Sequence, residues 1–241
     1  MSVLSLKLAG PLQSWGASAR FTRRTTESAP TKSAVIGLLA AAAGIERGDD
    51  ASLEPLAALR FGVRIDQPGS RVRDFQTAHH GVSGKSMPLS ERFYLADAVF
   101  VAAVEGDATL LSGLHAALRN PVYPPFLGRR SCPPAQPVDL GLHDGAASLM
   151  EVLGEVPWQA STWYRRQHSE QPDIELTVLR EACDDEGDFA DTLRDQPVSF
   201  AAEHRRHAVR TVVSDTVRVP RLSGGRLPLH EPFDALQEGN V

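Results

Sequence analysis

The sequence has few cysteines, the residues on which small disulfide-bonded or zinc-binding domains depend. Only two of its 241 residues are cysteines, Cys132 and Cys183, and they lie far apart, with no histidine at zinc-ligand spacing. This spacing excludes a zinc knuckle and argues against a disulfide framework. We therefore expect two ordinary thiols, no bound metal and no other cofactor.

Long apolar runs are also missing. No stretch approaches the ~20 apolar residues that a membrane-spanning helix requires, and the N-terminus reaches Gly10 and Pro11 without the apolar core of a signal peptide. Hydrophobic residues nevertheless make up 42% of the chain, which is enough to bury a real core. We expect a compact cytoplasmic protein that does not contact a membrane.

The charges are divided unevenly between the two parts of the chain. The net charge is −5, but residues 1–134 carry 15 Lys and Arg against 11 Asp and Glu, and residues 135–241 carry 10 against 19. A basic first part is compatible with a nucleic-acid-binding face, although a segregated surface charge explains the numbers equally well. Charge alone does not choose between these interpretations.

The first 145 residues predict an α+β domain. Period-two or continuous apolar stretches predict strands, and Ala/Leu-rich or amphipathic stretches that end at Gly or Pro predict helices. The resulting order is βαββαβ, the ferredoxin-like arrangement shared by RNA-recognition domains. The expected strands are 2–10, 59–67, 97–106 and 136–142, and the expected helices are 31–45 and 107–120.

Residues 146–241 are harder to interpret. We expect a second, smaller β-rich domain with strands at 147–156, 173–181 and 208–220. Residues 181–195 are strongly acidic and predict a solvent-facing loop that would repel nucleic acid.

Three stretches of the first domain carry side chains suited to binding anions. Residues 68–92 form a long polar connection between two strands, which is typical of a functional loop. Thr31, Lys32 and Ser33 stand at a helix start, where free amide groups attract phosphate, although simple N-capping explains them as well. In "FLGRRSCPP", residues 126–134, two arginines lie on a loop stiffened by glycine and prolines, and surface ion pairs are the alternative.

Five ordered blocks within the first 140 residues make a more specific pattern. They are "LAGPLQSWG", "APTKSAVIGLLAAAAGI", "RDFQTAHH", "RFYLADAVFVAAV" and "PPFLGRRSCPP". In this order and spacing they resemble Cas family five in its type I-E form, a subunit of the CRISPR RNA-guided surveillance complex Cascade. The part after residue 140 is similar to that family only in its length and β character.

The resemblance implies a non-catalytic RNA-binding subunit. It implies a ferredoxin-like palm at 1–145 with a thumb at about 68–92, which holds the 5′ handle of the crRNA and caps the filament of backbone subunits of Cas family seven. The Cascade large subunit would lie beside it, and target DNA would be reached through the assembled complex. The candidate RNA-binding residues are Gln13, Trp15, Arg20, Arg23, Arg24, Lys32, Ser33, Arg71, Arg73, His79, Lys85, Arg92, Arg129 and Arg130.

Two alternatives remain open from the residues. Some members of the wider family cleave crRNA precursors without metal, and Tyr94, Lys85, His79 and His80 are the residue types for such acid/base chemistry, but their spacing defines no catalytic set. A scaffold that does not read RNA is the third possibility. Trp15 is as compatible with a core or interface plug as with base stacking.

Overall fold

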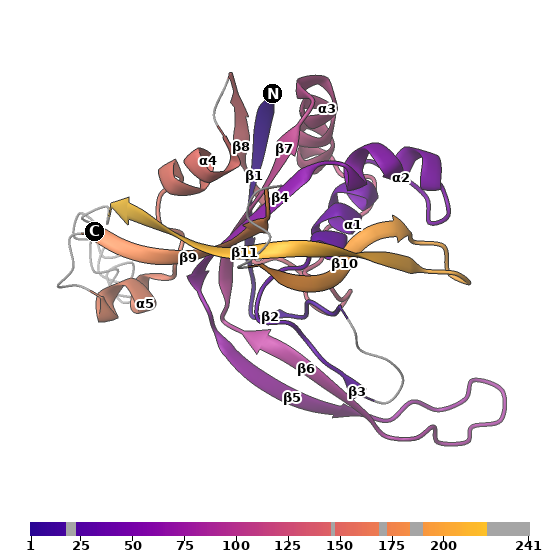
Figure 1. The fold of residues 1–241 in the computed structure, drawn as a ribbon. Coiled ribbons are helices and arrows are strands. Elements are labelled where there is room, and N and C mark those ends of the chain that lie inside the picture. Colours follow the sequence, from indigo (N-terminus) through magenta and orange to yellow (C-terminus); the bar gives the residue numbers. More distant parts are fainter. Residues whose placement is uncertain (18–22, 146–147, 169–172, 184–189, 221–241) are drawn as a thin grey trace, which may run out of the picture.

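The computed structural model describes residues 1–17, 23–145, 148–168, 173–183 and 190–220. Its centre is a seven-stranded antiparallel sheet in the order β10-β11-β9-β4-β7-β1-β8 (Figure 1). These strands are β1 (Ser2–Ala9), β4 (Arg60–Gln67), β7 (Val99–Gly106), β8 (Asp139–Asp144), β9 (Asp173–Glu181), β10 (Asp191–Ser199) and β11 (Arg206–Pro220). The expected α+β class is confirmed at the level of a mixed fold with antiparallel sheets.

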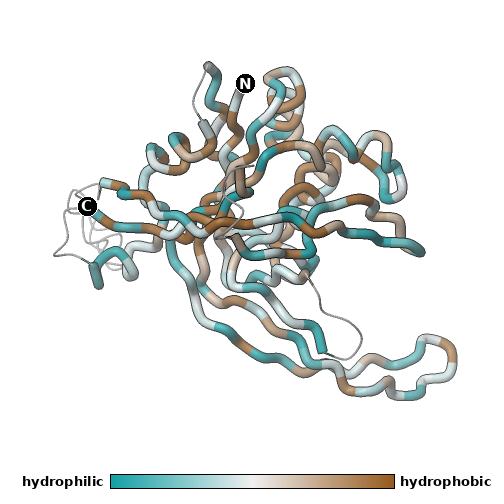
Figure 2. Tube along the Cα trace, in the orientation of Figure 1, coloured by the Kyte–Doolittle hydropathy of each residue, from teal (hydrophilic) through white to brown (hydrophobic). Residues whose placement is uncertain are grey.

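One face of the sheet packs on three helices, α1 (Lys32–Ala42), α2 (Asp50–Ala57) and α3 (Ala108–Arg119). The alternation of β1 explains this face, because Leu4, Leu6 and Leu8 are fully buried in the same cluster as α1 and α3. Figure 2 shows the apolar residues gathered where these helices meet the sheet. No helix among the described residues is long and apolar enough to cross a membrane.

The opposite face of the sheet carries α4 (Leu149–Glu155) and, further along, α5 (Thr162–Gln167). The strand predicted at 147–156 is wrong, because this stretch forms α4. Its start is a capping box in which Ser148 and Glu151 each accept a hydrogen bond from the other's backbone N–H. Val152 and Leu153 then pack against Val101 and Val178 of the sheet.

The C-terminal strands continue the central sheet. β9 pairs with β4 at three positions, and the β10–β11 hairpin lies on α1 and α2, where Gln196 Nε2 donates to the Ala57 carbonyl at 2.8 Å. The division into two domains at residues 145 and 146 stays a prediction. The acidic loop is shorter than expected, because residues 191–195 belong to β10; residues 184–189 lie outside the described part of the chain.

The long connection at 68–92 is an arm with regular structure. β5 (Ser70–Gln76) and β6 (Ser90–Ala96) form an antiparallel hairpin that projects from the sheet between β4 and β7 (Figure 1). Two short strands, β2 (Leu12–Gln13) and β3 (Arg23–Arg24), pair with β6 and connect the arm to the N-terminal segment. The expected insertion between the second and third predicted strands is therefore present as a β-ribbon.

Candidate nucleic-acid interface

Three segments that are distant in sequence converge at the base of the arm. They are β3, the β5–β6 hairpin and the loop 126–134, and we call their shared surface the arm base. Its cations are Arg23, Arg24, Arg71, Arg73, Arg92, Arg129 and Arg130.

The loop 126–134 is held in one conformation by backbone contacts. The Leu127 carbonyl accepts from the N–H of Ser14 at 3.1 Å, and the Leu127 N–H donates to the Cys132 carbonyl at 2.7 Å. Gly128 has φ of 83°, and a Cβ at this position would lie 1.8 Å from the Ser14 carbonyl oxygen. Only glycine fits this turn. Cys132 is buried beneath the loop, and burial raises the pKa of its thiol.

The two arginines of this loop have different environments. The guanidinium of Arg129 lies 4.6 Å from the centre of the Tyr94 ring, and its Nη2 donates to the Arg24 carbonyl at 3.0 Å. The other terminal nitrogen of Arg129, Nη1, is buried and has no hydrogen-bond partner among the residues that the structure describes. Arg130 is exposed and has no ion pair among the described residues. Arg129 therefore anchors the loop, and Arg130 is free to meet a ligand.

On one face of the hairpin, arginines lie against aromatic rings. Arg23 lies 5.3 Å from the Phe93 ring centre and Arg73 lies 4.7 Å from that of Phe75. Both arginines share the carboxylate of Glu91, at 3.9 and 3.6 Å. Because these ion pairs are exposed, they contribute little to stability, and a phosphate can replace the carboxylate at small cost. Guanidinium groups over aromatic rings are also suited to stacking on unpaired bases.

The middle of the arm base contains hydrogen-bond donors without acceptors. Arg92 of β6 has two register partners, Arg24 on β3 and Asp74 on β5, so it lies between a like and an opposite charge. Within the described part of the chain, the Nε of Arg92 is buried without a partner, like the Nη1 of Arg129. Arg71 Nη2 donates to the Thr26 carbonyl at 3.2 Å. Buried donors without acceptors are costly, and phosphate or base oxygens would satisfy them.

The histidines and the lysine of the arm lie at its far end. His80 Nδ1 accepts from the N–H of Ser83 at 3.2 Å, and the His80 N–H donates to the Lys85 carbonyl at 2.9 Å. His79 forms a bridge with Ser86, so the pair shapes the turn at the tip. Tyr94 is buried eight residues after Ser86, which corresponds to roughly 25 Å of extended strand. The residue types considered for RNA cleavage are therefore not brought together.

Gln13 and Trp15 are core residues in this structure. Both are fully buried; Gln13 Nε2 donates to the carbonyls of Leu8 and Ala98, and its Oε1 accepts from the Trp15 indole N–H at 3.1 Å. The prediction that they contact RNA disagrees with this placement, because no base can reach the indole ring. The alternative interpretation of Trp15 as a core plug fits it.

The start of α1 also differs from the prediction. The backbone N–H of Lys32 donates to Asp195 Oδ2 at 2.7 Å, and its Nζ forms a 2.7 Å ion pair with Glu181. Lys32 is 3% exposed, and burial lowers the pKa of its ammonium group. The helix start attracts an anion, as expected, but that anion is a carboxylate of β10. Neither Lys32 nor the neighbouring Ser33 joins the arm base.

Some of the site was outside the reach of sequence reasoning. The rings of Phe75, Phe93 and Tyr94 were not predicted as platforms, although the alternation of Arg with aromatic residues in "RVRDF" and "RFY" is the signal that could have found them. Arg20 lies outside the described residues. Within the described part of the chain, no group of three His, Cys, Asp or Glu side chains could hold a metal ion.

Comparison with known proteins gives consistent matches. The model of a family described as CRISPR-associated protein (Cas_Cas5) matches residues 3–213. The CRISPR system Cascade subunit CasD of Escherichia coli (strain K12) is 37% identical over 174 residues, which are 65% of this chain and 78% of that protein. The crystal structure of a Cas protein aligns with a TM-score of 0.70 and 37% identity, over 91% of this chain and 98% of that one. A chain of a CRISPR RNA-guided surveillance complex aligns with a TM-score of 0.70 and 31% identity, over 90% and 91%.

Proposed function

This chain belongs to the CRISPR-associated Cas5 family, and we propose on that basis that it is the Cascade subunit that holds the 5′ handle of the crRNA. The arm base is the surface that binds this RNA. The guide segment of the crRNA recognises the target by base pairing. The protein therefore needs only to hold the RNA backbone and a few unpaired bases, without reading a long sequence.

The observation that carries this proposal is the unsatisfied state of the arm base. Its strands and loop carry seven arginines, the carboxylate of Glu91 is shared by two of them, and two buried guanidinium nitrogens have no acceptor among the described residues. Buried donors in a folded protein are usually paired, with protein atoms, ordered water or a ligand. Phosphodiester oxygens and base edges are such acceptors, and the aromatic rings beside the arginines suit single-stranded RNA.

The palm and the thumb of the proposal have support in the fold. The strands β4-β7-β1-β8 with α1 and α3 follow the order of a ferredoxin-like domain, in which the first and third strands are central. The arm projects between β4 and β7, where the family resemblance implies a thumb. Val82, Met87 and Leu89 are exposed near its tip and are suited to contact a neighbouring protein. We assign this contact to a backbone subunit.

The remaining partners follow from the same role. A subunit that holds the 5′ handle ends the filament of backbone subunits and lies beside the large subunit, and it meets target DNA only through the assembled complex. We propose that it takes no part in cleavage. This is supported by the separation of buried Tyr94 at the arm base from His79, His80 and Lys85 at the tip.

The test uses two exposed arginines of the arm base whose side chains have no partner among the described residues, Arg24 and Arg130. In an assembled complex, Arg24→Gln with Arg130→Gln should weaken handle-RNA binding and lower the slope of log affinity against log salt by about 1.4, because single-strand counterion release contributes about 0.7 per phosphate. The melting temperature should not change.

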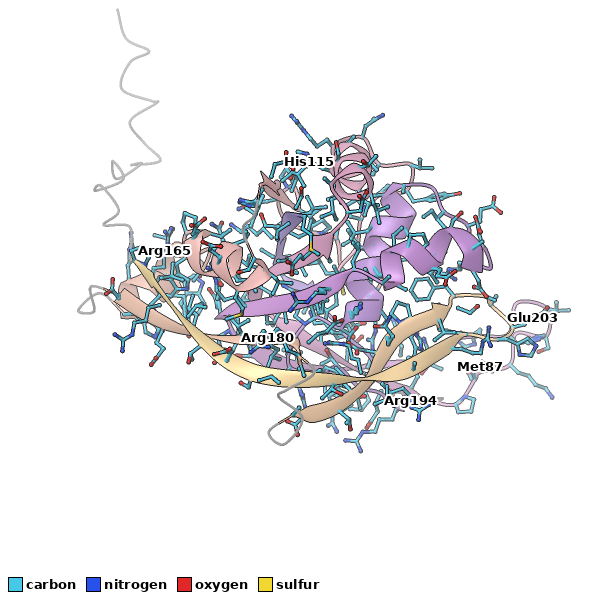
Figure 3. The ribbon with its side chains drawn as sticks, turned by 45° about the horizontal axis from the view of Figure 1, so that its top comes forward. Met87, His115, Arg165, Arg180, Arg194 and Glu203 are labelled. Carbon is cyan, nitrogen blue, oxygen red and sulfur yellow. The ribbon has the colours of Figure 1, made fainter. Side chains whose placement is uncertain are left out.

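The matched control is Arg165→Gln with Arg166→Gln. It removes the same charge from α5, and Figure 3 places Arg165 at the opposite end of the molecule from Met87 of the arm tip. If both double variants reduce the slope equally, the arm base is not a specific RNA surface. If neither changes binding, the chain acts as a scaffold, and cleavage of repeat RNA by the complex-free protein in chelator would favour the endoribonuclease alternative.

A further inference from the structure

The arm leaves the sheet through two short connections in unusual backbone conformations. On the outgoing side, Gly69 has φ of 70°, and a Cβ there would lie 2.4 Å from the Ala96 carbonyl oxygen. On the returning side, Asp97 has φ of 55°, and its N–H donates to the Pro11 carbonyl at 3.2 Å. Positive φ in a residue other than glycine is unfavourable and persists only where the surroundings hold it. The junction is therefore a defined joint.

Gln67, the last residue of β4, connects this joint to a different part of the molecule. Its side chain is 1% exposed, and its Nε2 donates to the carbonyl oxygen of Asp97. Its Oε1 accepts two hydrogen bonds from Ser161, from the backbone N–H at 3.1 Å and from the hydroxyl at 2.7 Å. One amide group thus joins the returning strand of the arm to the residue that precedes α5.

Ser161 gives up a local interaction to make this link. It occupies the N-cap position of α5, where a serine hydroxyl usually accepts a hydrogen bond from the helix backbone, but no side-chain cap is formed. The hydroxyl donates to Gln67 in its place. The hydroxyl of Ser161 is therefore used for the hydrogen bond to the arm root and not to cap α5.

The segment before α5 is rigid enough to serve as an anchor. The Trp158 indole N–H donates to the Asp66 carbonyl at 2.9 Å, and the Gln159 N–H donates to the Asp66 carboxylate at 2.5 Å. Asp66 is in turn paired with buried Arg64 at 2.7 Å. Buried, fully paired networks of this kind hold a single geometry.

We infer that Gln67 is a positioning residue that fixes the direction of the arm by tying its root to the 157–161 segment. On one side the arm root is held by β2 and by Gln13, which donates to the Ala98 carbonyl. A ribbon held on that side alone can rock about its root. Gln67 supplies the anchor on the α5 side, so the arm projects at one angle before it meets RNA.

The consequence for RNA binding rests on the proposed function, but the geometry can be tested without RNA. Spin labels on Val82→Cys at the tip and Ser112→Cys on α3, in a Cys183→Ser background, report the distance between arm and body by pulsed electron paramagnetic resonance. Val82 is 94% exposed, and Cys132 is buried and stays unlabelled. The unchanged chain should give one narrow distance distribution.

Three substitutions probe the link. Gln67→Ala removes the whole link and should broaden or shift the distance distribution. Gln67→Glu keeps both acceptor contacts with Ser161 but loses the donor to the Asp97 carbonyl, so it should also broaden or shift the distribution. Ser161→Ala should broaden it less and add nothing to Gln67→Ala, because both act on one connection. Gln76→Ala on exposed β5 is the matched control and should change nothing.

An unchanged distribution in both Gln67 variants would overturn the inference, even if their melting temperatures fall, because that result describes a residue that stabilises the fold alone. In the assembled complex, Gln67→Ala should weaken handle binding about tenfold, while its salt slope stays intact since no phosphate contact is removed. A broadened arm with unchanged handle affinity would leave the positioning role standing and count against the arm base as the RNA site.

Discussion

The arm base and the start of α1 both present basic side chains, but only at the start of α1 does the fold supply a fully buried carboxylate, that of Asp195. Lys32 forms an ion pair with Glu181. The carboxylate of Asp195 accepts a hydrogen bond from the backbone N–H of Lys32 at the helix start, and two more from the Nε and Nη2 of Arg210, at 2.6 and 3.0 Å. At the arm base, by contrast, arginines outnumber carboxylates, and the Glu91 carboxylate that Arg23 and Arg73 share is partly exposed. Buried polar atoms without a partner among the described residues occur in both regions: Arg92 Nε and Arg129 Nη1 at the arm base, and Thr31 Oγ1 and Arg210 Nη1 at the start of α1.

This difference shows how a fold turns the same residue type into a structural or a binding element. A cation that meets a buried carboxylate is neutralised, and its removal costs stability. A cation that meets carbonyls, rings, other cations or a shared, partly exposed carboxylate keeps charge for a ligand.

Asp195→Ala should cause the largest loss of stability. Asp195 is fully buried, and its removal leaves Arg210, whose side chain is 9% exposed, without a counter-charge. Breaking a buried pair from one side costs about 3–5 kcal/mol in the free energy of unfolding. Unfolding by denaturant measures this loss of free energy. The control is Asp191→Ala, because Asp191 is an exposed position on the same strand. Handle binding by the folded fraction should not change; a specific loss of RNA affinity would contradict the division of roles.

Gly128→Ala should be the next largest effect, and it should affect both stability and binding. Gly145 provides a matched position, since its φ of 84° nearly equals the 83° of Gly128, but no described residue beyond its chain neighbours has an atom within 4 Å of its Cβ site. Left-handed strain costs about 1–2 kcal/mol at either residue. The collision with Ser14 should raise the loss at Gly128 to about 3 kcal/mol, as misfitting core changes do, and displace Arg129 and Arg130. Equal losses at both glycines would show that the loop can move freely.

Lys32→Met should lower the free energy of unfolding by about 2 kcal/mol near neutral pH, because the part-buried carboxylate of Glu181 is left without its donor. Burial lowers the pKa of Lys32 from 10.5, so between that lowered pKa and 10.5 the unfolded chain binds more protons than the folded one. The stability contributed by this group therefore rises with pH in that window. Unfolding measured from neutral pH up to 10.5 should show this rise in the unchanged chain and not in the variant. A fall in RNA affinity with no loss of stability would return Lys32 to the RNA surface.

Much of the first 145 residues could be predicted because local pattern and tertiary structure agree there. The alternation in β1, the Ala/Leu-rich α1 and the stop of α3 before Pro121 are all local signals. The strand predicted at 147–156 failed because its apolar residues were weighed without the Ser148–Glu151 capping box. The hairpin at 70–96 was hidden because its residues are mostly exposed and lack apolar alternation.

The site could be predicted only in part, because pairing depends on residues far along the chain. The charge of Lys32 is cancelled by Glu181, which is 149 residues away, and its helix start by Asp195, which is 163 residues away. No local pattern around "APTKS" contains that information. The two arginines of "FLGRRSCPP" were found from their own loop, but their different roles depend on Tyr94 and on the carbonyl of Arg24.

The smallest and most discriminating effect is expected from separating Arg129 and Arg130. Arg129→Gln removes a guanidinium over the Tyr94 ring and a hydrogen bond to Arg24, so it should lower the free energy of unfolding by about 1 kcal/mol. Arg130→Gln removes an exposed cation and should leave the melting temperature unchanged, while it lowers the salt slope of handle binding by about 0.7.

Substitution of each arginine by lysine separates the two roles further. Arg130→Lys keeps the point charge and should restore the slope, whereas Arg129→Lys loses the planar stacking group and should remain destabilised. If Arg130→Gln melts earlier and keeps the full slope, then both arginines are structural, and the RNA contact belongs to the remaining arginines of the arm base.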